Sequence, residues 1–92
     1  MKALADLEPR FVVAQGRRVG VSFACPACGV HRVSVNVDPP FDAGRPAAHP
    51  HQRTGESFAD LTLTPSVVAY RRDRFGNARE CWHGHITAGV CS

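Results

Sequence analysis

The chain has 92 residues, which is enough for one small domain and too few for a two-domain enzyme. Hydrophobic residues make up 43% and charged residues 21%, a composition that excludes full disorder, and no apolar run approaches the roughly 20 residues of a membrane span. The net charge of +3 is spread thinly along the chain, so nucleic-acid binding is not favoured. Without a visible export signal, we expect one cytoplasmic, soluble domain over residues 1–92.

A short helix or turn over residues 3–7 opens the chain, and β-type patterns follow. Valines, phenylalanines and threonines recur with a period of two, punctuated by Gly and Pro. Residues 41–55 lack this periodicity and are expected to form a long loop. Pro65 is expected to end the third strand. The alternation predicts strands at residues 18–24, 32–37, 57–64, 66–70 and 79–86, the first two paired as an antiparallel hairpin.

Four cysteines, Cys25, Cys28, Cys81 and Cys91, carry the clearest chemical signal. Because no export signal is visible, a metal site is favoured over disulfides. The spacing Cys25-x-x-Cys28-Gly29 is that of a zinc knuckle, in which two thiolates bind one ion and the glycine permits the backbone to bend. We therefore predict a mainly β fold, a small single domain of antiparallel hairpins with a zinc-knuckle turn, stabilised by structural zinc.

The fourth zinc ligand has alternatives. Cys91 is favoured because a turn at residues 87–89 could bring the tail back and complete a site of four thiolates, but His31, His83 and His85 are candidates too. Four buried, inert thiols are the structural alternative to any metal site. Two further histidines lie in the long loop, His49 and His51, and are expected to be solvated rather than ligating.

Ser66 directly follows Pro65, where the third strand is expected to end, and a serine in that position is normally a turn residue. If residues 73–76 form the loop of the following hairpin, Arg72 pairs with Asn77 and Ser66 pairs with His83 on one face. A serine beside a histidine is the minimum for nucleophilic acyl transfer, in which the imidazole removes the hydroxyl proton as attack begins. A register slip of one residue would destroy this pairing.

Metal binding is a competing role for His83. In this register Cys81 and His83 share a strand face, so both could bind the same ion. A zinc-bound imidazole has no free lone pair with which to act as a base, so the two roles exclude each other. From spacing alone the ligand role is favoured.

Five stretches that run nearly from end to end of the chain carry a family resemblance. They are LEPRF at 7–11, FACPAC at 23–28, QRTGE at 52–56, LTLTPS at 61–66 and WHGHITAG at 82–89. Together they resemble a small bacterial and phage family, formerly of unknown function. Some of its members occur in operons for bacterial ubiquitin-like conjugation and are serine peptidases that process or remove the ubiquitin-like protein.

The resemblance implies that Ser66 is a nucleophile and His83 its base. The implied reaction is deubiquitinase-like, cleaving peptide or isopeptide bonds after the C-terminal tail of a ubiquitin-like protein, and the implied partner is that protein or its conjugates. The position of Cys81 suits a zinc ligand. Cys91 lies beyond the recurrent pattern of the family, so His31 is the substitute for it as the fourth zinc ligand. With the resemblance added, we expect His83 to act as base rather than as ligand.

This sequence departs from the family pattern at two places. His85 stands where the family has an aromatic residue, and residues 88–90 replace its usual Asn-Gly-Glu turn. No acidic third member of a triad is identifiable, and Asp60 is a candidate only by proximity. The alternative function is a non-catalytic, zinc-ribbon-like module that binds protein or nucleic acid.

Overall fold

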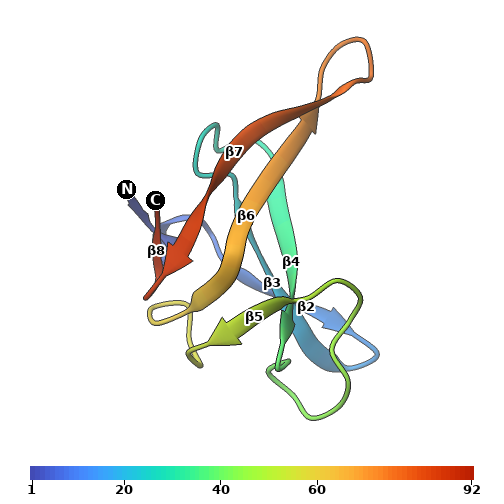
Figure 1. Ribbon diagram of the computed structural model, residues 1–92, viewed down its shortest axis with the longest axis vertical. Helices are drawn as coiled ribbons and strands as arrows, with labels where there is room; N and C mark the ends of the chain where they lie inside the picture. Colours follow the sequence, from blue (N-terminus) through green and yellow to red (C-terminus); the bar gives the residue numbers. More distant parts are fainter.

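The computed structural model describes residues 1–92 as strands joined by short turns and two longer loops (Figure 1). Strands dominate, so the mainly β expectation is confirmed. No helix is long and apolar enough to cross a membrane. The elements are β1 (Lys2–Ala3), the 3-10 helix η1 (Leu4–Asp6), β2 (Arg10–Ala14), β3 (Arg17–Ala24), β4 (Arg32–Asp38), β5 (His51–Thr54), β6 (Thr62–Arg72), β7 (Ala78–Thr87) and β8 (Val90–Cys91).

The strands form one sheet in the order β1-β8-β7-β6-β5-β4-β3-β2. Neighbours are antiparallel except β4 and β5, which are parallel. Both chain ends lie at the same edge, where β1 pairs with β8 (Figure 1). The long β6–β7 hairpin projects beyond the other strands (Figure 1).

The predicted hairpin of β3 and β4 is present. Its alternating apolar residues face the core, and the facing pairs Val21–Val35 and Phe23–Val33 are buried in it. The knuckle turn between the strands is closed by backbone hydrogen bonds from Cys25 to His31 and from Gly29 to Cys25. Period-two patterning was therefore sufficient to find this part of the fold.

Strand β6 differs from the prediction because Pro65 does not end it. The strand continues to Arg72, and the proline lies in an irregular stretch between the pairs Leu63–Ile86 and Val67–Gly84. Proline lacks an N–H and is tolerated in a strand at such bulges. Residues 57–60, expected to begin the third strand, form a turn instead.

Strand β5 was not predicted, because it lies inside residues 41–55 and lacks apolar alternation. Its buried residue is Arg53, whose guanidinium donates to the carbonyls of Pro39, Pro40 and Gly55 and lies 4.2 Å from the centroid of the Phe41 ring. Hydrophobic patterning cannot detect a strand that is buried through an arginine. This short strand connects the two hairpins into one sheet.

Candidate active site and metal-binding group

The structure brings Ser66 and His83 together. Ser66 Oγ lies 2.9 Å from His83 Nε2, within hydrogen-bond distance. Both side chains are accessible, since Ser66 is half-buried and His83 exposed. A serine hydroxyl that contacts the imidazole nitrogen has the geometry needed to pass its proton to a base.

The register that produces this contact differs from the predicted one. The hairpin loop has five residues, Asp73–Asn77, and Arg72 pairs with Ala78 rather than Asn77. The side chain of Asp73 explains the longer loop, because it accepts hydrogen bonds from the backbone N–H groups of Phe75 and Asn77. The hydrogen bond from Arg79, followed by these backbone contacts, lowers the pKa of Asp73.

A second irregularity lies at Cys81. Ala69 pairs with Trp82 but Tyr70 pairs with Glu80, so Cys81 is an extra residue that β6 does not match. The two shifts together make Val68, rather than Ser66, the partner of His83. A slip of two residues keeps every side chain on its face, whereas a slip of one would not. Ser66 then reaches His83 from the irregular stretch that contains Pro65.

Glu80 is the acidic neighbour of His83. Its Oε1 lies 3.5 Å from His83 Nδ1, on the ring edge opposite Ser66, and both side chains are about half exposed. Residues three apart normally point to opposite faces of a strand, so spacing gave no signal for this pair. Asp60 is not at the site: it accepts hydrogen bonds from Ser57, which lower its pKa.

His51 holds the backbone of Ser66. Its Nε2 lies 3.1 Å from the Ser66 carbonyl oxygen, and the residue is half-buried at the start of β5. His51 was expected to be solvated in a loop, but it belongs to β5, a strand that lacks the apolar alternation by which strands are predicted. The contact couples β5 to the position of the serine.

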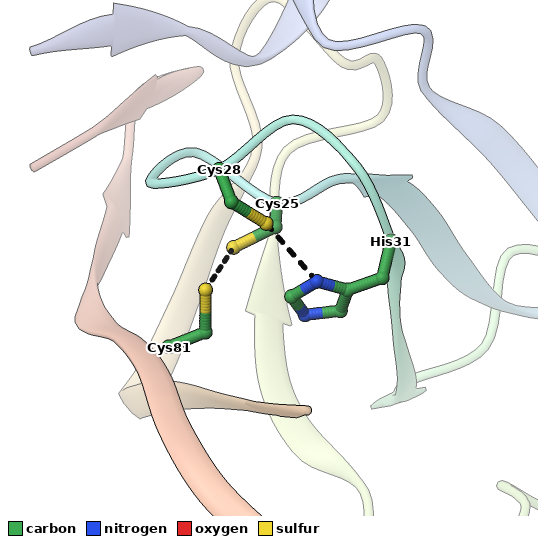
Figure 2. A group of neighbouring side chains, drawn as sticks. All are labelled: Cys25, Cys28, His31 and Cys81. Atoms are coloured by element: carbon green, nitrogen blue, oxygen red, sulfur yellow. Dashed lines mark hydrogen bonds between the residues drawn. The ribbon is translucent and has the colours of Figure 1, made fainter. Parts of the chain in front are cut away.

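Four residues that could hold a metal ion, called the metal-binding group below, lie together at the β3–β4 turn and on β7. Cys25, Cys28, His31 and Cys81 point toward one another, with all potential ligand atoms within 4.8 Å (Figure 2). The Sγ atoms of Cys25 and Cys81 are 3.7 Å apart. Two thiolates at about 2.3 Å from one tetrahedral zinc ion would be about 3.8 Å apart, so the spacing is compatible with zinc.

Two thiols of the metal-binding group have pKa values shifted in opposite directions. The pKa of Cys28 is lowered to about 6, chiefly by the backbone N–H of Val30, which donates to its Sγ. The pKa of Cys81 is raised to about 11, chiefly by burial and also by its hydrogen bond with Cys28. A bound cation would favour the thiolate form of these cysteines.

His31 joins this group, and Cys91 does not. His31 Nδ1 lies 3.1 Å from Cys28 Sγ, and its Nε2 is buried without a partner. The turn at residues 88–89 does return the chain, but it pairs Cys91 with Ile86 of β7 and Lys2 of β1, inside the core. Burial there raises the pKa of the Cys91 thiol. The structure thus groups three members of the predicted ligand set, Cys25, Cys28 and Cys81, with His31, and it places Cys91 apart from them.

The bulge at Cys81 separates the two roles that competed for His83. Because two residues of β7 oppose one of β6 there, the Cys81 side chain is directed to the cysteines of the knuckle, while His83 contacts Ser66. The shared face expected from an unbroken strand does not occur. His85, another candidate ligand, also lies outside the metal-binding group.

A comparison with protein families gives one match, which covers residues 2–92. Its description is "bacterial ubiquitination-like system serine protease (BubE)". No curated protein and no solved structure matches the chain. The match spans almost every residue described above, including the Ser66–His83 contact and the metal-binding group. The chain therefore belongs to the BubE family of serine proteases of bacterial ubiquitination-like systems.

Proposed function

We propose that this protein is a deubiquitinase-like serine peptidase that cleaves peptide or isopeptide bonds after the C-terminal tail of a bacterial ubiquitin-like protein. The observation that supports it best is the 2.9 Å contact between Ser66 Oγ and His83 Nε2, in a chain of this family. His83 lies outside the metal-binding group, so its lone pair is free to accept a proton. The partners are the ubiquitin-like protein and its conjugates.

In the proposed reaction, Ser66 Oγ attacks the carbonyl carbon of the scissile bond while His83 Nε2 takes the hydroxyl proton. The imidazolium then gives that proton to the leaving amine, and an acyl-enzyme remains on Ser66. Water, deprotonated by His83, hydrolyses the acyl-enzyme and regenerates the serine. Glu80 faces Nδ1 and stabilises the imidazolium formed in each half of the reaction.

Cys25, Cys28, His31 and Cys81 would hold a zinc ion in a structural role. Four protein ligands fill a tetrahedral site and leave no position for water or substrate, so the ion would supply rigidity rather than a nucleophile. It would fix Cys81, and with it the strand that carries His83, to the β3–β4 turn. Four free thiols suit the reducing cytoplasm, where we place the reaction.

A non-catalytic interaction module is the competing function, and one experiment separates the two. The zinc-loaded protein is incubated with a ubiquitin-like protein conjugated to a target, beside Ser66→Ala, His83→Ala and the matched control Ser92→Ala. We expect wild type and Ser92→Ala to release the modifier with an intact C-terminus, and the other two variants to retain zinc and fold without cleaving. Equal cleavage by Ser66→Ala, or loss of zinc from His83→Ala, would support the module instead.

A further inference from the structure

The sheet lacks a strand beside the Ser66–His83 pair. Strand β5 separates β4 from β6, but it pairs only with Val37 and Asp38 of β4 and with Thr62 to Thr64 of β6. Beyond His51 no strand continues along its line, whereas β4 and β6 both extend further (Figure 1). Because each strand's other edge is already paired, one edge of β4 and one edge of β6 are open there.

A hollow of about 180 Å³ lies between these open edges. His31 and the start of β4 form one wall, and the second half of β6 forms the other; the residues are His31, Arg32, Val33 and Ser34, and Val68, Ala69 and Tyr70. This volume is below the roughly 300–1,000 Å³ of sites that enclose a small molecule. It suits one or two residues of a chain that crosses it in extended form.

The backbone of β6 offers hydrogen-bonding groups to this hollow. The Ser66 carbonyl points away from β7, since it contacts His51 of β5. Backbone groups of a strand alternate in direction, so the N–H and C=O of Val68 point to the same open side, while those of Val67 and Ala69 point to β7. By the same alternation, about half of the peptide groups at residues 32–36 point away from β3.

We propose that this hollow binds the extended C-terminal tail of the ubiquitin-like protein as an inserted strand, in line with β5 and hydrogen-bonded to Val68. The inference rests on the proposed function and adds the place where the substrate binds. The hollow begins two residues from Ser66, so an inserted strand leads directly to the nucleophile. The tail is the part common to every substrate, and main-chain pairing binds it whatever protein follows.

Hydrogen exchange tests this pairing. The probe is a ubiquitin-like protein of such a system, added to zinc-loaded, ¹⁵N-labelled Ser66→Ala so that no cleavage occurs. We expect exchange of the Val68 amide to slow by about tenfold or more in the complex, because it gains a hydrogen bond. The amides of Val67 and Ala69 should change little, since β7 already pairs with them. The same modifier without its C-terminal tail should leave Val68 unchanged.

A substitution that fills the hollow provides a second test of the proposed strand insertion. Ser34→Trp places a large side chain on the β4 wall, and Val13→Trp, on the exposed edge strand β2, is the matched control. We expect Ser34→Trp to weaken modifier binding by about tenfold or more, about 1.4 kcal/mol, and Val13→Trp to bind as wild type. Unchanged binding by Ser34→Trp, or Val68 exchange that is not slowed, would overturn the proposal.

The two proposals fail differently. A fluorophosphonate reacts with an activated serine without needing a bound tail, so labelling of the wild type tests the peptidase function separately from the hollow. Normal labelling of the wild type, with modifier binding unchanged in Ser34→Trp, would contradict the inserted strand alone. Absent labelling of the wild type, with Val68 protected by the modifier, would contradict the peptidase function alone.

Discussion

At the scale of single residues, the site depends on two irregular positions in an otherwise regular hairpin. The stretch with Pro65 brings Ser66 to His83, and the bulge at Cys81 sends that cysteine to the metal-binding group while His83 and Glu80 meet. Bulges re-aim side chains and are over-represented beside active sites. A regular two-stranded ladder would have placed Cys81 and His83 on one face and Glu80 on the other.

Glu80→Gln tests the acid of the proposed triad. The variant keeps the shape of the side chain and removes its charge. Loss of the acid in a well-ordered triad costs about 10⁴ in kcat. Here Glu80 Oε1 is 3.5 Å from Nδ1 and half exposed, so we expect a smaller loss, about tenfold to 100-fold in kcat, with little change in KM. A Glu80→Gln variant with the full wild-type kcat, measured beside a Glu56→Gln control, would exclude a role of Glu80 in stabilising the His83 imidazolium.

At the scale of the elements, β5 is the strand on which the arrangement depends. It connects the β3–β4 hairpin to the β6–β7 hairpin, carries His51 to the Ser66 carbonyl, and ends where the open edges begin. It is held by an arginine rather than by an apolar stripe. The side chain of Arg53 is 5% exposed and satisfies three carbonyls, so its polar contacts replace the usual hydrophobic burial.

Arg53→Ala is expected to lower the free energy of unfolding by about 1–3 kcal/mol, because it removes three hydrogen bonds of a buried guanidinium and its contact with the Phe41 ring. The control is Arg71→Ala, at an exposed arginine. Its free energy of unfolding should stay within about 0.5 kcal/mol of the wild-type value. Urea unfolding of both zinc-loaded variants measures the difference. An Arg53→Ala protein as stable as Arg71→Ala would show that β5 is held by other contacts.

The loop before β5 is fastened to β3 by Asp42. The carboxylate accepts hydrogen bonds from the side chain and backbone N–H of Arg18, which lower the pKa of Asp42 to about 2. A depressed carboxyl pKa stabilises the fold above the unfolded value of about 3.9, and this contribution is lost as the pH falls toward 2. We therefore expect Asp42→Asn to be less stable than wild type at pH 7, and we expect this difference to narrow as the pH falls below about 5.

Urea midpoints of wild type and Asp42→Asn across this range measure the effect, and Arg18→Gln should follow the same pattern because it removes the other partner. Because acid also releases zinc and the fold depends on it, the comparison runs from pH 7 down to the lowest pH at which both proteins still hold the ion. A difference in stability that does not narrow over this range would assign it to something other than the charge of Asp42.

How far the sequence predicts the structure depends on the interaction that holds each element. The β3–β4 hairpin and β6 bury alternating apolar residues, so period-two patterning locates them. Strand β5 is buried through Arg53, and the pairings at Ser66 and Cys81 depend on bulges that no local pattern marks. The Ser66–His83 contact was predicted from a pairing register that differs by two residues from the one in the structure. The prediction of contact still holds, because a shift of two residues leaves each side chain on the same face of the hairpin.

At the scale of the whole molecule, the metal-binding group connects the two hairpins at the end remote from β5. Cys25, Cys28 and His31 come from the β3–β4 turn and Cys81 from β7, so one ion would tie the strand that carries His83 to the rest of the sheet (Figure 2). Structural zinc supplies roughly 10–16 kcal/mol of apparent binding free energy, comparable with or above the 5–15 kcal/mol stability of a whole domain.

Zinc content and folding should therefore change together. We expect one zinc ion per chain in wild type and in Cys91→Ala, because that thiol lies in the core away from the group. His31→Ala should bind zinc weakly, and a chelator should unfold the wild type and abolish cleavage. Elemental analysis and circular dichroism measure both effects. Zinc retained by His31→Ala but lost from Cys91→Ala would show that Cys91, and not His31, is the fourth zinc ligand.

The most direct measurement is the reaction of the zinc-loaded protein with a fluorophosphonate, followed by peptide mass spectrometry. An activated serine next to a free imidazole predicts one label per chain, on Ser66, with labelling absent in Ser66→Ala and slowed by about 100-fold or more in a folded His83→Ala protein. Failure of Ser66 to react in the folded, zinc-loaded wild type, or equal labelling without His83, would contradict the serine–histidine site.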